Sequence, residues 1–339
     1  MSKTDSNGRA PTLIDVAQLA KVSVSTASKA LNGRSDVSDV TRQRVVDAAK
    51  ELNFVPNTLA KSLLTGRTGT VGLITHDFEG RFSIPLLMGA EDAFGLNKVS
   101  VLLCDARGDA IRERYHLGVL MQRRVDGLII VGARPDMRPS LGRDLPVPVV
   151  YAYAPSDDPQ DCSIVSDNVG AGRLGVNHLL TSGRRNIAIL GGDVTYGASE
   201  ERARGAIARL AEDGLVPLGG QPLFGAWSEA WGRAAMRTVL HQNPEVDGVL
   251  CGNDQIARGA LDTLRDEGRN VPSDVAVVGH DNWAILATGA RPALTSIDMD
   301  LEDIGRRAAK RLAEAMDGRP SHGIELQAPR LVVRNSSAA

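Results

Sequence analysis

The fold of the N-terminal region is decided by residues 12–32, which read TLIDVAQLAKVSVSTASKALN. Thr12 and Asp15 stand at the spacing of a helix capping box, and the apolar residues around them recur with helical periodicity, at Ile14, Val16, Ala17 and Ala20. Ser23 can cap a second helix over residues 24–31, which the Asn-Gly pair at 32–33 ends. Two short helices joined by so few residues are typical of a helix-turn-helix.

A third helix is predicted over residues 39–52, with Ser38 as its cap and an apolar face of Val45, Ala48, Ala49 and Leu52. In a helix-turn-helix the second helix enters the major groove, where its first side chains reach base edges. That helix offers Val24, Ser25, Thr26, Ser28 and Lys29. A lysine can bond guanine and a valine can touch a thymine methyl group. The alternative is a plain structural module whose polar stripe is only solvated.

Residues 12–32, together with Phe-Val-Pro-Asn at 54–57 and Ala-Lys-Ser-Leu at 60–63, resemble the LacI/GalR family of bacterial transcriptional repressors. The resemblance implies that Val24, Ser25 and Lys29 read bases, and that the positions facing phosphates are Ser23, Thr26, Ser28 and Asn32. It also implies that residues 57–63 form a hinge helix only on DNA. The DNA-binding positions of that segment are Asn57, Ala60, Lys61 and Leu63.

By this resemblance Leu63 is the leucine that enters the minor groove. The physical chemistry agrees, because an isolated helix of about two turns is marginal in water and an apolar wedge between base steps kinks the duplex. Folding of the hinge would then depend on binding DNA and a partner chain. The alternative for this segment is a simple linker, which we keep for residues 65–69 only.

Composition and charge fit a chain with two kinds of domain. Residues 1–70 carry ten Lys or Arg against six Asp or Glu, so their net charge is +4 and the rest of the chain, within a total of −2, carries −6. The first ten residues read as a disordered tail without a signal peptide, and no apolar run is long enough to span a membrane. The three cysteines are an odd number and are widely spaced, which argues against a disulfide framework. We therefore expect a cytoplasmic protein.

From residue 70 onward, short β-branched runs alternate with amphipathic helices. Strands are predicted at residues 71–75, 99–104, 126–131 and 148–151, and a second series at 186–190, 246–251, 275–279 and 331–333. These predict two doubly wound α/β lobes, and the resemblance implies a type I periplasmic-binding-protein-like core that the chain crosses three times. We expect the DNA-binding domain at 11–56, the hinge and linker at 57–69, the first lobe at 70–166 plus 299–325, and the second at 167–298 plus 326–335.

Open α/β sheets bind ligands beyond the carboxyl ends of their strands. Polar and aromatic residues follow several predicted strands, and the resemblance assigns some of them to effector contact. The expected effector-binding residues are Asp77, Phe78, Phe82, Arg202, Trp227, Asn253 and Asp281. Carboxylates, an arginine and an amide suit hydroxyl groups, and aromatic faces suit a sugar ring. Each of these residues could instead be a cap, a turn residue, a surface cation or a core aromatic residue.

Tyr153 stands where many members of the family carry aspartate, so a nucleoside or another metabolite stays an alternative to sugar. An enzyme is the rival from another class, but the six histidines are scattered, no HExxH or Walker A motif occurs, and neither cofactor nor metal is expected. A solute-binding protein of a transporter would share the core, but the N-terminal DNA unit argues against it. We expect a homodimer on a pseudo-palindromic operator, with ligand controlling whether the hinge helices form.

Overall fold

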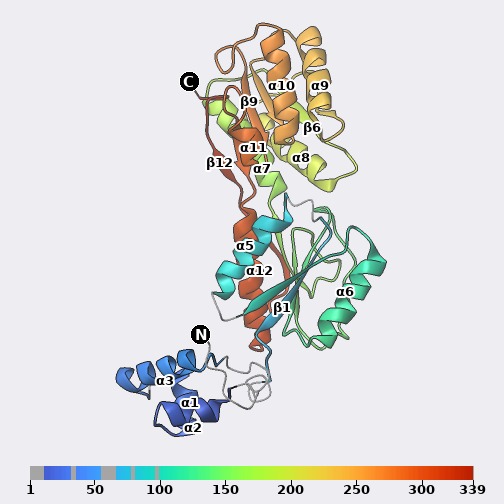
Figure 1. Cartoon of the computed structure of the whole chain (residues 1–339). Helices are drawn as coiled ribbons and strands as arrows, with labels where there is room; N and C mark the ends of the chain where they lie inside the picture. The colour runs from blue at the N-terminus through green and yellow to red at the C-terminus, as the bar shows by residue number, and fades with distance from the viewer. Residues whose placement is uncertain (1–10, 32–35, 55–65, 78–80, 96–98, 339) are drawn as a thin grey trace. The chain divides into compact units, whose positions relative to one another are not determined.

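A computed structural model describes residues 11–31, 36–54, 66–77, 81–95 and 99–338 (Figure 1). The chain divides into two compact units, Met1–Thr68 and Gly69–Ala339. The tail expected at residues 1–10 and the hinge helix expected at 57–63 lie outside the described residues. In the part of the chain that the structure describes, no helix is both long and apolar enough to cross a membrane.

The first unit contains three helices, α1 Leu13–Leu19, α2 Val24–Leu31 and α3 Asp39–Glu51. The capping box of α1 forms, because the Asp15 carboxylate accepts the Thr12 amide at 2.7 Å while the Thr12 hydroxyl accepts the Asp15 amide at 3.5 Å. Small buried side chains close the core between the helices, among them Val16, Ala17, Ala27 and Val45. The three helices confirm the predicted helix-turn-helix.

One expected core residue of α1 is not buried. Ile14 is 53% exposed, so its assignment to the apolar face is wrong. The reason is geometric: Val16, Ala17 and Ala20 define a narrow stripe, and at about 100° per residue Ile14 falls well outside it. A helix of 7 residues packs against its neighbours along that one stripe only.

The first lobe of the second unit is built on a six-stranded sheet in the order β11-β5-β4-β3-β1-β2, with every pair parallel. Helices α5 Ser83–Phe94 and α12 Leu301–Met316 lie side by side on one face (Figure 1), and α6 Ala110–Gln122 covers the other. The strands are β1 Thr70–Thr75, β2 Ser100–Asp105, β3 Leu128–Val131, β4 Val149–Ala152, β5 Cys162–Ser166 and β11 Gly323–Gln327.

The second lobe repeats this plan in the order β12-β10-β9-β8-β6-β7, where β12 alone is antiparallel to its neighbour. Helices α7 Asn168–Thr181 and α8 Gly197–Glu212 pack on one face, and α9 Glu229–Gln242 and α10 Asp254–Asp266 on the other. The strands are β6 Ile187–Gly191, β7 Leu223–Phe224, β8 Gly248–Cys251, β9 Ala276–His280, β10 Thr295–Asp298 and β12 Arg330–Val332, and α11 Ala284–Ala287 follows β9.

The chain passes between the lobes three times, after β5, after β10 and between β11 and β12. The predicted pair of doubly wound lobes is confirmed. The boundary expected after residue 325 falls inside β11, because this strand pairs with β5 as far as Gln327. Strands β5, β7, β10 and β11 and helix α11 were not predicted from the sequence.

Reciprocal glycines set the distance between paired helices in both lobes. A Cβ at Gly205 of α8 would lie 2.0 Å from the carbonyl oxygen of Val169 in α7, and a Cβ at Gly172 of α7 would lie 1.9 Å from that of Arg202 in α8. Helices α5 and α12 make the same reciprocal contact through Gly89 and Gly305, and α9 and α10 make it through Gly232 and Gly259. Any larger residue there would push the two backbones apart.

Candidate functional site

The DNA-reading residues expected on α2 lie mostly at its surface. Val24, Ser25 and Lys29 are exposed, and Thr26 and Ser28 are half-buried. The exposed Ser23 caps the helix, because its hydroxyl oxygen accepts the Thr26 amide at 3.0 Å. Asn32, Asn57, Ala60, Lys61 and Leu63 lie outside the described residues.

Lys29 already has an acidic partner. Its Nζ lies 2.6 Å from Asp36 Oδ2, and the two side chains are 50% and 53% exposed. A pair so exposed contributes about 0–1 kcal/mol. Lys29 can therefore leave Asp36 for a base or a phosphate at small cost.

A pocket of about 220 Å³ lies between the two lobes of the second unit. Its walls are loops and helices that follow the carboxyl ends of β1, β3, β4, β6, β7, β8 and β9. Six of the seven expected effector residues line it, namely Asp77, Phe82, Arg202, Trp227, Asn253 and Asp281. Phe78 lies outside the described residues. Residues that are far apart in the sequence therefore meet in one cavity beyond the carboxyl ends of the strands, as expected for open α/β sheets.

Three large side chains that line the pocket were not among the expected effector-binding residues, namely Arg81, Tyr153 and Tyr196. Tyr153 stacks on Phe82 with 5.1 Å between ring centroids and 23° between ring planes. Tyr196 meets Trp227 edge to face, with 5.7 Å between centroids. The pocket thus has one aromatic pair from the first lobe and another from the second.

Two polar atoms of this pocket have no hydrogen-bond partner among the described residues. They are the indole Nε1 of Trp227, which is a donor, and Oδ2 of Asp281, which is an acceptor. Arg81 Nη2 lies 2.7 Å from that oxygen, but the approach lacks hydrogen-bond geometry, so the contact is an ion pair. Buried polar atoms are normally paired, and these two leave one donor and one acceptor for a ligand.

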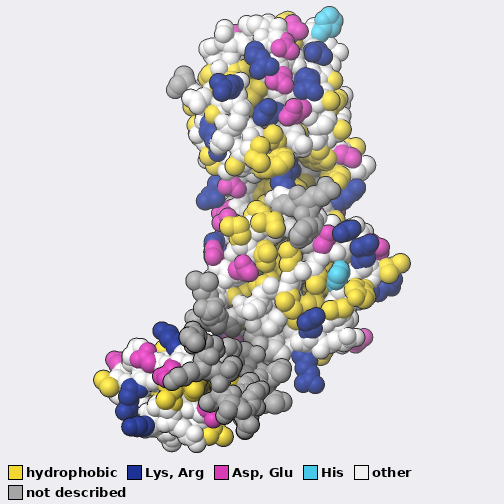
Figure 2. Space-filling view, in the orientation of Figure 1, with side chains coloured by type: hydrophobic (Ala, Val, Ile, Leu, Met, Phe, Trp, Pro, Cys, Tyr) yellow, Lys and Arg dark blue, Asp and Glu magenta, His cyan; other side chains and the backbone are white. Residues whose placement is uncertain are grey.

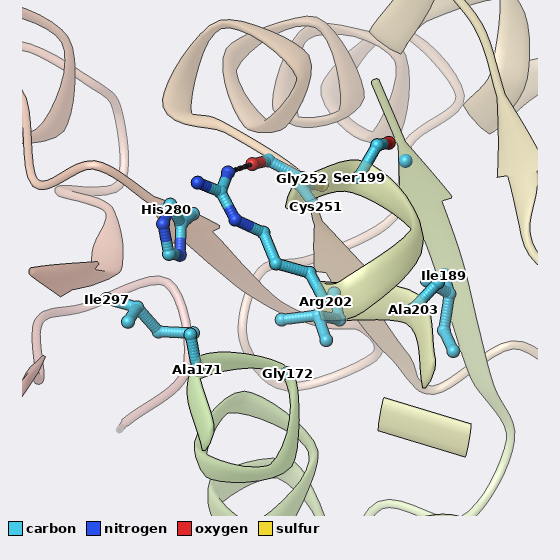
Figure 3. Close-up of a pocket in the computed structure, with 12 residues that line it drawn as sticks. Ala171, Gly172, Ile189, Ser199, Arg202, Ala203, Cys251, Gly252, His280 and Ile297 are labelled. Atoms are coloured by element: carbon cyan, nitrogen blue, oxygen red, sulfur yellow. Dashed lines mark hydrogen bonds between the residues drawn. The ribbon is translucent and has the colours of Figure 1, made fainter. Parts of the chain in front are cut away.

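Arg202 is held from several sides rather than free in the pocket. Its Nε donates to Asn168 Oδ1 at 3.0 Å and its Nη1 donates to the Gly252 carbonyl at 2.7 Å, while Nη2 lies 3.7 Å from the Met299 sulfur. Figure 3 shows the bond to Gly252 and the neighbouring His280. Burial lowers the pKa of Arg202. The surface-cation interpretation is excluded by these contacts.

The cavity in Figure 3 is distinct from the interlobe pocket. It has a volume of about 20 Å³ and lies within the second lobe, beside Arg202 and His280. A space of this size holds about one water molecule. Burial lowers the pKa of His280 well below its ordinary value, so the imidazole is neutral at pH 7.

The side chains of Asn253 and Asp254 form hydrogen bonds that fix the backbone next to the pocket. Asn253 caps α10, because its Oδ1 accepts the Ile256 amide at 2.8 Å. The buried Asp254 accepts the Ser296 hydroxyl at 2.6 Å and the Trp283 amide at 2.7 Å. Burial, with the nearby charge of Asp281, raises the pKa of Asp254 to about 7. These bonds fix residues 281–283, where Asp281 has a φ of +97°.

Among the described residues, no group of His, Cys, Asp and Glu side chains could hold a metal ion. The charged side chains of the pocket are two arginines and two aspartates, which balance in formal charge. The arrangement suits an uncharged ligand that has hydroxyl groups and a flat apolar face.

A helix-turn-helix unit followed by two α/β lobes with a pocket between them defines a DNA-binding protein with a sensor core. Residues 12–57 match the model of bacterial regulatory proteins of the lacI family, and residues 176–337 match the periplasmic binding protein-like domain. The regulator CelR of Thermobifida fusca is 35% identical over 326 residues, which cover 94% of this chain and 95% of CelR.

The chain belongs to the LacI family of transcriptional regulators. A solved complex of CelR with cellobiose is 32% identical and has a TM-score of 0.64, covering 96% of this chain and 100% of the other. The Lac repressor dimer bound to operator and the anti-inducer ONPF is 27% identical with a TM-score of 0.73, covering 98% and 100%. The membership confirms the predicted family and excludes the enzyme alternative.

Proposed function

We propose that this regulator binds an operator as a homodimer and that an uncharged sugar in the interlobe pocket controls its affinity for DNA. The observation that carries the sugar assignment is the pair of atoms without a hydrogen-bond partner, Trp227 Nε1 and Asp281 Oδ2, in a pocket that also contains two aromatic pairs. A sugar hydroxyl can accept from the first and donate to the second, while its ring lies on an aromatic face.

The charge balance of the pocket supports a neutral ligand over a phosphorylated one. The two arginines and two aspartates that line it balance in formal charge, so a phosphorylated ligand would give the pocket a net negative charge whereas an uncharged one would not. The complex of the related CelR with cellobiose supports a sugar further. A nucleoside would use the same aromatic faces and is the alternative to test alongside.

The homodimer is supported by the Lac repressor dimer and by apolar surface on α5. Ile84 is 39% exposed and Met88 51% exposed on this helix, and Figure 2 shows hydrophobic side chains gathered over α5. A second copy could cover them. Two DNA-reading units related by a twofold axis would match a pseudo-palindromic operator.

A thermal-shift screen of the full-length protein tests the effector. Cellobiose, other disaccharides, monosaccharides and nucleosides would each be added, and every compound that raises Tm would then be titrated into an operator-binding assay. We expect a disaccharide to raise Tm and to change operator affinity. Stabilisation by nucleosides alone would contradict the sugar assignment.

Lys29→Ala tests the DNA-reading face of α2. We expect a loss of about 1–3 kcal/mol on the cognate operator and little on random DNA, since a base contact carries sequence information. Equal losses for Lys29→Ala on both DNAs would assign Lys29 to phosphate instead.

Leu63→Ala is expected to lower specific binding and DNA bending together.

A further inference from the structure

Arg81 places its guanidinium inside the interlobe pocket and bridges the two lobes. It comes from the segment before α5 in the first lobe, and its Nη2 lies 2.7 Å from Oδ2 of Asp281 after β9 in the second lobe. The two side chains are only 21% and 4% exposed. Arg81 therefore pairs with the carboxylate that the proposed sugar would use.

Two aromatic rings flank the same guanidinium. Its Cζ lies 4.5 Å from the centroid of the Phe82 ring and 5.1 Å from that of the Trp283 ring. A guanidinium is planar, with faces that stack on aromatic rings and N–H donors around its edge. A sugar ring likewise presents an apolar face and a rim of hydroxyl donors. The position of the guanidinium between these two rings therefore identifies a subsite that fits a flat group with hydrogen-bond donors at its edge.

We propose that Arg81 is an internal competitor, occupying one subsite of the effector pocket, so that an effector must displace its guanidinium from Asp281 to bind. This inference rests on the proposed function of the pocket. Arg81 then sets the effector concentration at which the regulator responds. If the subsite is open in a tenth of the molecules, the apparent affinity for effector is about tenfold weaker than that of an open pocket.

Chemical rescue of an emptied subsite tests the occupancy without knowledge of the effector. Arg81→Ala and Arg81→Gln would be titrated with ethylguanidinium at low millimolar concentration, with thermal unfolding as the readout and an equal concentration of NaCl as the salt control. We expect the largest rise of Tm in Arg81→Ala, where the guanidinium site beside Asp281 is empty, a smaller rise in Arg81→Gln, whose side chain fills part of that site, and none in the wild type.

Two controls make the rescue specific. Arg81→Ala combined with Asp281→Asn should lose the response, since the carboxylate that holds the cation is gone. Arg134→Ala should not respond either, because Arg134 stacks on Tyr196 at 4.0 Å and has no contact with Asp281 in the structure. The same Tm change in all variants, or none in either Arg81 variant, would overturn the proposal. Arg81→Gln covers the case in which the alanine variant does not fold.

Calorimetric titration with cellobiose separates competition from direct contact. We expect Arg81→Gln to bind cellobiose about tenfold more tightly than the wild type, and Arg81→Lys to lie between them because lysine keeps the charge without the stacking plane. Weaker binding by Arg81→Gln would make Arg81 a ligand-contacting residue and refute the competitor role. If ethylguanidinium rescue succeeds but no sugar or nucleoside binds any variant, the proposed effector class is wrong. The conclusion that Arg81 occupies a subsite of the pocket is then retained.

Discussion

At the scale of single residues, a cluster of polar side chains near the end of β1 makes the stability of the first lobe depend on pH. Glu113 Oε2 lies 2.5 Å from His76 Nε2, and its Oε1 accepts Arg138 Nη2 at 2.8 Å. Burial alone would raise the pKa of Glu113, but the hydrogen bonds from His76 and Arg138 outweigh it and lower this pKa to about 2. The ionised carboxylate therefore stabilises the fold.

Glu113→Gln should remove that stabilisation. A carboxyl group with a depressed pKa in the fold contributes stability above its unfolded pKa of 4.5, and this is lost as pH falls toward about 2. We expect the variant to lose about 3 kcal/mol at pH 7 and to show a smaller decline of stability between pH 5 and 3 than the wild type. Urea unfolding across this pH range measures both. Parallel stability curves for the two proteins would show that Glu113 contributes no such term.

The residues of the pocket show how far sequence reasoning reaches at this scale. Asp77, Asn253 and Asp281 could be predicted because each follows a strand within two residues, and parallel strands bring their carboxyl ends to one edge of the sheet. Arg81 could not, because its position is set by contacts with Asp281 and Trp283, which are about 200 residues away in the chain. No local pattern encodes such a pairing.

At the scale of elements, three of the strands that were missed lack a strong apolar run. Strand β7 has only two residues, and β11 alternates half-buried and exposed positions at the edge of its sheet. Strand β10, TSID, contains a single large apolar side chain, Ile297. These strands are stabilised by their neighbours in the sheet rather than by their own composition, whereas the buried runs of β1, β3 and β9 are recognisable alone.

The reciprocal glycine contact between α7 and α8 carries a prediction. Gly205→Ala would place a Cβ 2.0 Å from the Val169 carbonyl oxygen, so the helices must separate. Overpacking of this kind costs about 1–3 kcal/mol, which thermal unfolding would detect. Gly118→Ala on α6 is the matched control, since nothing lies within 4 Å of its Cβ, and alanine there should stabilise the helix by about 0.5–1 kcal/mol. Similar changes in both variants would rule out close packing as the cause.

At the scale of the whole core, contacts across the cleft decide how the lobes close on each other. Asp136 Oδ1 in the first lobe accepts the amide of Gly197, the first residue of α8 in the second lobe, at 2.7 Å. The residue before that helix, Tyr196, offers no side-chain cap of its own. A carboxylate from the opposite lobe thus satisfies a helix N-terminus and meets its dipole.

Asp136→Ala should therefore loosen the closed arrangement. We expect weaker binding of any pocket ligand, because part of its binding free energy must then close the lobes. Operator affinity without ligand should change as well, because the same closure equilibrium controls binding to DNA. Small-angle scattering would report a larger radius of gyration for the variant, and Asp136→Asn should retain part of the effect because the amide oxygen still accepts. An unchanged ligand affinity would show that this capping bond has no part in closure.

The coupling between pocket and operator must be reciprocal, whatever conformational change carries it, because sugar and DNA bind the same protein at equilibrium. A sugar that changes operator affinity by a given factor has its own affinity changed by the same factor when operator DNA is present. Trp227→Phe should reduce sugar affinity with and without DNA by the same factor, because it removes the unpartnered indole N–H of the pocket while the contacts of the ring, with Tyr196 and Arg202, stay within the second lobe. Titrating sugar into the protein with and without operator, for the wild type and this variant, measures all four affinities. A different coupling factor in the variant would show that the substituted residue takes part in the coupling as well as in sugar binding.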